Sequence, residues 1–127
     1  MHQLATILAE FGADIGLPAL APGARGNLQL RLGSGAMLGV GEHGDEVVLH
    51  YAESVPYGIE TLVLKAMRKL ALCECAADPV QMGVRSTAQG RWLVVATRLP
   101  LEQFSAREMH RLSSHLQSWL EHARDAD

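Results

Sequence analysis

The segment that decides the fold is Tyr57–Ala77, with the sequence YGIETLVLKAMRKLALCECAA. It is the most apolar helical segment of the chain, and it separates two blocks of alternating residues. The spacing of three and four residues that stacks side chains on one helix face recurs at Val63, Ala66, Met67, Leu70, Ala71 and Glu74. Because Leu62, Leu64 and Leu72 lie off that face, we expect a helix that is buried on most sides.

Whether this helix is covered by its own domain or by a second subunit decides the expected oligomeric state. The chain has 127 residues, which fits one domain spanning positions 1–127. One small domain provides one sheet, and that sheet covers one side of a helix. We therefore expect a second subunit on the other side. The alternative is a central helix that is buried entirely within its own domain.

The flanking blocks predict an antiparallel sheet. Period-two alternation between glycine-containing turns is typical of strands with one buried face. This pattern occurs in five runs, at 27–32, 36–41, 47–52, 82–86 and 91–99. The last run, RWLVVATRL, is apolar on both faces from Trp92 to Ala96, which predicts a place in the centre of the sheet or at an interface.

Two further helices are expected at the ends of the chain. Residues 2–16 carry one apolar stripe, and Ser105 and Glu108 have the spacing of a capping box that begins the last helix. One stripe of that last helix consists of Met109, Leu112, Leu116, Trp119, Leu120 and Ala123. The predicted order of elements is α-β-β-β-α-β-β-α. The fold class is α+β, with a twisted antiparallel sheet packed with helices.

Composition excludes several function classes. The net charge is −3 and no cluster of basic residues is present, so a nucleic-acid partner is not expected. No window is apolar enough to span a membrane. The first sixteen residues lack the basic start of a signal peptide, and we expect a cytoplasmic protein.

The chemistry of a catalytic or metal site is not apparent. The glycine-rich segment 33–44 lies between two predicted strands and has Leu38 where a dinucleotide-binding pattern needs glycine. His115 and His122 share a helix face but are two turns apart, too far for one zinc ion. We expect no metal, no cofactor and no enzymatic activity. Surplus apolar surface on a small acidic domain instead indicates a protein-binding site.

With this order of elements, the sequence resembles the class I type III secretion chaperones, the family with the CesT/SycE-like fold. The resemblance covers about residues 4–124 and is carried by ILAEFGADIGLP at 7–18, GVGEHGDEVVLHYA at 39–52, VLKAM at 63–67 and WLVVATRL at 92–99. The opening helix with Phe11, then Asp14, then Ile15–Pro18 is the family's common start. Among subtypes, the layout is most similar to SycN-like chaperones, which pair with a second chaperone on the secretion gatekeeper.

The resemblance implies a cytoplasmic bacterial dimer that holds the N-terminal segment of a secreted effector or gatekeeper in an extended form, without nucleotide. The partner subunit is either a second copy or a second small chaperone. The implied dimer interface consists of Val63, Ala66, Met67, Leu70, Trp92 and Val94. The implied cargo-binding residues are Ile7, Phe11, Leu30, Leu38 and Val40. All of these residues have an alternative role as plain core.

Two other functions stay open at this point. One is a roadblock- or longin-like dimeric scaffold domain, which would bind a folded partner. The other is an enzyme with an unrecognised small-ligand site, which a deep polar pocket would favour.

Overall fold

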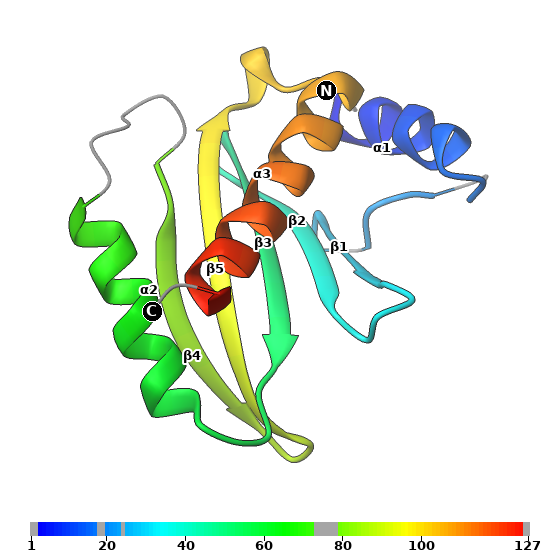
Figure 1. Cartoon of the computed structure of the whole chain (residues 1–127). Coiled ribbons are helices and arrows are strands. Elements are labelled where there is room, and N and C mark those ends of the chain that lie inside the picture. The colour runs from blue at the N-terminus through cyan, green and yellow to red at the C-terminus, as the bar shows by residue number, and fades with distance from the viewer. Residues whose placement is uncertain (1–2, 18–19, 24, 73–78, 126–127) are drawn as a thin grey trace.

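The computed structural model describes residues 3–17, 20–23, 25–72 and 79–125. These residues form three α-helices and five strands in the predicted order, and Figure 1 shows their arrangement. Their bounds are α1 Gln3–Asp14, β1 Asn27–Arg31, β2 Met37–His43, β3 Glu46–Ser54, α2 Ile59–Leu72, β4 Gln81–Thr87, β5 Gly90–Pro100 and α3 Ala106–Asp125. A 3₁₀ turn, Leu101–Gln103, precedes α3. The predicted fold class is confirmed.

The five strands form one antiparallel sheet with the order β1-β2-β3-β5-β4. Tight hairpins set the register of neighbouring strands. Gly44, with φ +65°, adopts the left-handed conformation that the turn between β2 and β3 needs, and His43 pairs with Glu46 across it. As the sequence predicts, β5 lies inside the sheet between β3 and β4, which leaves β1 and β4 as the edges.

All three helices contribute to one core on one face of the sheet (Figure 1). The helix α3 lies across β3 and β5, with α1 and α2 packed on either side of it. Its buried stripe is Met109, Leu112, Leu116, Trp119, Leu120 and Ala123, as the periodicity predicts. The amide of Glu108 donates a hydrogen bond to the Ser105 hydroxyl at 3.1 Å, so the predicted N-cap is present.

The orientation of α2 differs from the prediction. Its buried residues are Ile59, Leu62 and Ala66, whereas the exposed fraction of Met67 is 53%. The spacing placed Met67 on the main apolar stripe, as a residue of the dimer interface, and Leu62 off that stripe in a helix expected to be buried on most sides. The helix is apolar over so much of its girth that spacing alone cannot select one face, and the selection is made by contacts with α3 and β5. The predicted continuation through residues 73–77 lies outside the described residues.

Strand alternation separates the two faces of the sheet as predicted. On β3, Val47 and Leu49 face the helices, and Val48 and His50 face the other side. The register carries this division across every strand. Because the helices cover only the first face, the second is the open sheet face.

Candidate protein-binding surfaces

The first candidate surface lies at the β4 edge of the sheet and on the outer side of α2. Leu64, Met67 and Val84 are exposed by 55%, 53% and 50%, and we call them the α2–β4 surface. The side chains of Lys65 and Lys69 mark the opposite side of the helix, because both reach α3. Leu64 and Met67 therefore point away from the rest of the domain. Exposed large apolar residues beside an unpaired strand edge are typical of a protein-binding site.

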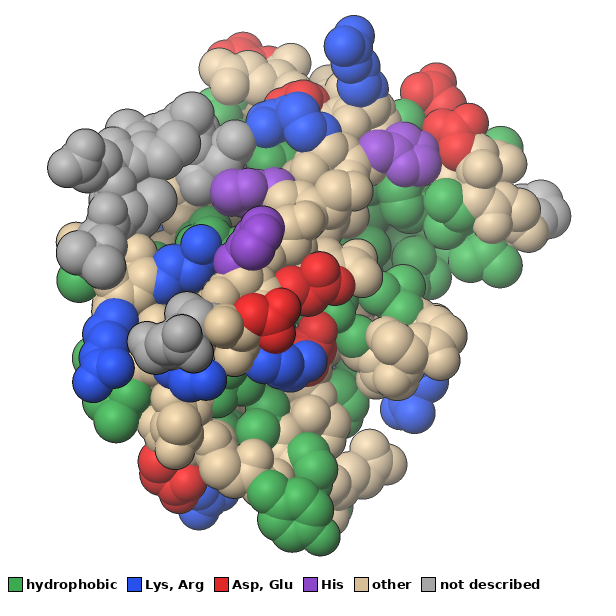
Figure 2. Space-filling model, viewed as in Figure 1, with side chains coloured by type: hydrophobic (Ala, Val, Ile, Leu, Met, Phe, Trp, Pro, Cys, Tyr) green, Lys and Arg blue, Asp and Glu red, His purple; other side chains and the backbone are tan. Residues whose placement is uncertain are grey.

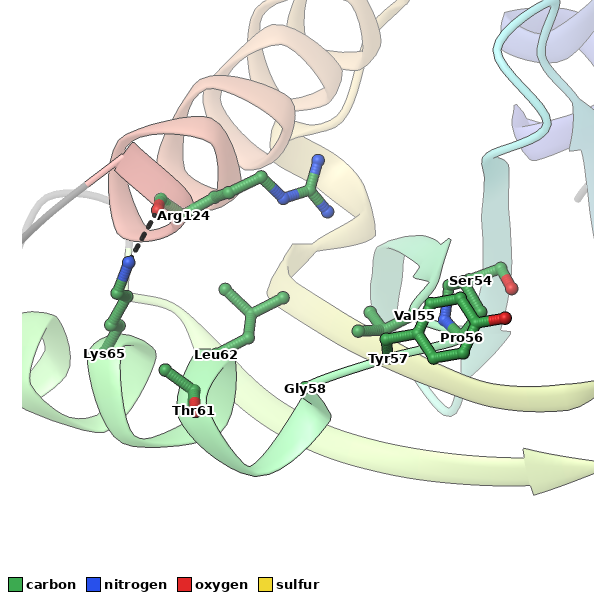
Figure 3. A pocket seen from close by; sticks show the side chains of 9 residues that line it. All are labelled: Ser54, Val55, Pro56, Tyr57, Gly58, Thr61, Leu62, Lys65 and Arg124. Carbon is green, nitrogen blue, oxygen red and sulfur yellow. Dashed lines mark hydrogen bonds between the residues drawn. The ribbon is translucent and has the colours of Figure 1, made fainter.

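Contacts around a polar hollow at the start of α2 hold that helix in place. The hollow encloses about 400 Å³ between Ser54–Gly58 and the end of α3 (Figure 3). Lys65 Nζ donates a hydrogen bond to the backbone carbonyl oxygen of Arg124 at 3.2 Å, where the helix dipole favours a cation. These contacts tie α2 to α3 and leave its outer side uncovered.

The same end of α3 is tied to the sheet. The Arg124 guanidinium forms an ion pair with Glu53, and the Tyr51 hydroxyl donates to that carboxylate. Burial, and then the hydrogen bond to Glu53, raise the pKa of Tyr51 well above its usual range. Tyr51 therefore stays neutral and acts as a donor. This group has the character of a structural clamp, since Glu53 on β3 bonds both to Tyr51 and to Arg124 on α3.

The second candidate surface lies between α1 and the β1 edge. Ile7, Leu28 and Leu30 are half-buried against the margin of the core, and Ile15 and Leu17 are exposed by 42% and 45%. We call these five residues the α1–β1 surface. Apolar side chains gather on the right-hand side of the molecule, below α1 (Figure 2). Within the described part of the chain, the edge of β1 beside them has no strand partner on its outer side.

The structure divides the sequence-predicted cargo residues between surface and core. Ile7 and Leu30 lie on the α1–β1 surface. Phe11, Leu38 and Val40 are only 4%, 5% and 1% exposed and belong to the core of the chain. Their contacts with a partner would require α1 or the sheet to open. The alternation of residues along the strands places Leu30 and Leu38 on the same face of the sheet, and the register agrees. It does not show how far the helices extend over that face.

The sequence-predicted dimer residues are divided in a similar way. Met67 is exposed on the α2–β4 surface, and Val63 and Leu70 are half-buried beside it. Ala66 is fully buried within the chain. Trp92 and Val94 lie on the open sheet face, opposite the helix layer, so a second subunit on α2 alone does not reach them.

Sequence reasoning missed two members of the α2–β4 surface. Leu64 was placed off the buried stripe without being recognised as an exposed anchor. Val84 pairs with Leu93 and therefore faces the helix layer, but its place on an edge strand leaves it half exposed. The signal for Val84 was present in the run 82–86, because a strand that ends a sheet has only one neighbour to cover its side chains.

The third candidate surface is the open sheet face. Its middle is apolar and half-buried, which is unusual because the uncovered face of an antiparallel sheet normally alternates to polar residues. The residues that line its hollow include Met37, Val48, Ala52, Trp92, Val94 and Ala96. The hollow encloses about 570 Å³. Gly39 contributes to its depth, since a β-carbon there would lie 2.1 Å from Cε1 of His50.

Metal and membrane sites are not observed in the part of the chain that the structure describes. Among residues 3–17, 20–23, 25–72 and 79–125, no group of three or more His, Cys, Asp or Glu side chains could hold a metal ion. No helix within these ranges is long and apolar enough to cross a membrane. The features with evident binding capacity are the three apolar surfaces.

Comparison with known proteins identifies the fold. No family model and no curated protein matches the sequence. Several solved structures match nearly the whole chain. The HopA1–SchA chaperone–effector complex has a TM-score of 0.69 at 17% identity, covering 98% of this chain and 94% of that chain. The ExsC–ExsE complex has a TM-score of 0.70 at 15% identity, covering 97% and 92%.

The third structure is the type III secretion chaperone SycH of Yersinia pestis in complex with a stable fragment of YscM2. Its TM-score is 0.63 at 14% identity, covering 97% of this chain and 98% of that chain. The chain therefore shares the fold of these chaperones from end to end, as the sequence resemblance implied. At these identities the likeness is one of fold.

Proposed function

We propose that the protein is a type III secretion chaperone that binds the N-terminal segment of a secreted effector or gatekeeper in an extended, secretion-competent form. The observation that carries the proposal is the fold similarity over nearly the whole chain to chaperones that were solved with a bound partner. The three apolar surfaces support it, because a small domain has little other reason to expose them.

We assign cargo binding and subunit binding to opposite edges of the sheet. The α1–β1 surface binds the cargo, since an unpaired strand edge next to apolar side chains suits an extended segment. The α2–β4 surface binds a second small chaperone subunit, either another copy or a different chaperone as in the SycN-like subtype. Apolar side chains of the cargo are thereby kept from aggregation before secretion. We place this activity in the cytoplasm and assign no catalytic step to it.

The test is co-expression of the chain with tagged N-terminal segments from a panel of type III secreted proteins. We expect one segment to co-purify and to resist limited proteolysis without showing a cooperative thermal transition of its own. Capture of a folded domain, with no segment captured, would contradict the proposal and favour a scaffold domain.

A matched pair of variants locates the cargo site. Ile7→Glu places a charge on the α1–β1 surface, and Ala9→Glu places the same charge on an exposed part of α1. We expect Ile7→Glu to weaken capture about tenfold, as burial of a charge next to an apolar contact costs more than 1.4 kcal/mol. Ala9→Glu should have little effect. Equal effects would exclude the α1–β1 surface as the cargo site.

A further inference from the structure

We propose that the open sheet face is a second binding site of the protein, which takes an amphipathic segment of the captured chain whose apolar side chains are flanked by Asp or Glu. This inference rests on the proposed function in one respect, namely that the segment belongs to the captured protein. It names a surface and a ligand chemistry separate from the α1–β1 surface.

The shape and composition of the hollow suit an apolar ligand. Val94 pairs with Ala52 on one side and with Gly83 on the other, so small residues surround a bulky one. Trp92 forms one end of the hollow, and its Nε1 donates a hydrogen bond to the Thr87 hydroxyl at 3.2 Å. An aromatic side chain that is already fixed loses little conformational freedom when a ligand packs on it.

The charged side chains that line the hollow are basic. Arg31 on β1 and Arg85 on β4 line opposite sides of the hollow, with His50 between them on β3. The chain carries 14 acidic residues, yet none of the described residues that line the hollow is Asp or Glu. An acidic segment is therefore complementary to this face.

The α2 helix of a second copy is a poor match for the hollow. That helix carries Lys65, Arg68 and Lys69 against one acidic residue, Glu60. Lys65 and Lys69 reach α3, and Glu60 is paired with Arg91 at 3.3 Å. Docking of the exposed side of α2 on the hollow would therefore bring Arg68 toward Arg31 and Arg85, and like charges at an interface oppose binding. The α2–β4 surface and the open sheet face thus suit different partners.

His50 gives the site a pH dependence. Burial and the nearby Arg85 lower the pKa of His50 in the unoccupied protein. The other charged or titratable groups on this face are Arg31 on β1, His43 on β2, Glu46 on β3 and Arg98 on β5, and the last two form an ion pair at 3.6 Å. A bound carboxylate favours the protonated imidazole, so binding raises the pKa and takes up a proton. Affinity should therefore rise as pH falls below 7.

The experiment uses two synthetic amphipathic peptides of about 18 residues, which is about five helical turns. Both carry Leu at three- and four-residue spacing, flanked by Glu in one peptide and by Lys in the other. We expect the Glu peptide to bind in calorimetry and the Lys peptide to bind at least tenfold more weakly. Equal binding of both peptides, or no binding of the Glu peptide, overturns the proposal.

Charge-reversal variants assign the binding to this face. Arg31→Glu combined with Arg85→Glu should weaken binding of the Glu peptide about tenfold, since each exposed pair contributes about fivefold or less. Arg107→Glu, an exposed change on α3, is the matched control and should have no effect. His50→Gln should remove the increase in affinity between about pH 7 and pH 5.5, a range above the pKa of the peptide's glutamates. If the double variant instead converts a dimer to a monomer, a second copy covers the face and the proposal fails.

Different outcomes would contradict the proposed function and the proposed site on the open sheet face. Ile7→Glu should reduce capture of a secreted segment while the Glu peptide still binds to the open sheet face. If no secreted segment binds but the Glu peptide does, the proposed function fails and the site remains. If secreted segments bind but neither Arg31→Glu with Arg85→Glu nor His50→Gln alters any binding, the site fails and the proposed function remains.

Discussion

The two faces of the sheet have a similar apolar composition, but helices cover only one of them. On β5, Leu93 and Val95 face the helices and are fully buried, whereas Trp92, Val94 and Ala96 alternate with them and stay half-buried on the open face. The apolar character is similar on both sides. What distinguishes the faces is that α1, α2 and α3 all contribute to one core on the same side.

This comparison shows what an apolar residue can mean in a small domain. On the covered face, an apolar side chain stabilises the fold through burial within the chain. On the open face, the same side chain contributes little to the fold and is available to a partner. The predictions below test this difference with changes that are matched in chemistry.

The largest expected effect comes from one charge placed on each face of β5. Val95→Asp introduces an unpaired charge into the core and should destabilise the protein by about 3–5 kcal/mol, enough to unfold much of it. Val94→Asp lies on the open face and should cost about 1 kcal/mol. Urea denaturation followed by circular dichroism measures both. Equal losses would mean that the open face is as important to the fold as the covered one.

The second prediction asks which face a second subunit covers. Met67→Asp should split a dimer formed through the α2–β4 surface, raising its dissociation constant about 30-fold by a loss of about 2 kcal/mol. Light scattering should then report 13.8 kDa in place of twice that mass. Thr61→Asp, at another exposed position of α2, is the control and should leave the dimer intact.

Light scattering of Val94→Asp tests whether the second subunit contacts the open sheet face instead. We expect this variant to remain a dimer, because Val94 lies on the face opposite the helix layer. A dimer that survives Met67→Asp and dissociates with Val94→Asp would place the second subunit on the open face. That result would reverse the roles proposed for the two surfaces.

The sequence predicted the order of elements, the division of each strand into two faces and the stripe of α3. These features depend on local spacing, which periodicity records directly. The α1–β1 surface was found in part, through Ile7 and Leu30. The buried Phe11 shows the limit, since one helix carries both core and surface residues within one turn.

The remaining features depend on which element covers which, and spacing does not carry that information. Leu62 packs into the core and Met67 stays exposed on the single chain because contacts with α3 decide how α2 is rotated. Leu38 and Val40 were assigned to cargo, and the helix layer makes them core. Arg31 and Arg85 are 54 positions apart in the chain and meet across one hollow only through the strand order β1-β2-β3-β5-β4.

The smallest expected change in stability is that of a substitution at Gly39 on the open sheet face, which we compare with the same substitution at Gly12 in α1. A β-carbon at Gly12 in α1 would lie 2.4 Å from the carbonyl oxygen of Leu17 and 2.7 Å from Cβ of Leu20. Gly12→Ala should therefore destabilise the protein by about 1–3 kcal/mol, because these atoms cannot move aside independently. A β-carbon at Gly39 would meet only the ring of His50 among its nearest neighbours.

The imidazole of His50 can turn away into the hollow of the open face, and the added methyl group reduces the freedom of the unfolded chain. Gly39→Ala should therefore change stability by less than about 0.5 kcal/mol in urea denaturation. It should still weaken binding of the Glu peptide, because the displaced ring occupies the space that the ligand needs. A large loss of stability would show that His50 is held rigidly, and the hollow would then be a packed part of the fold and not a site for a partner.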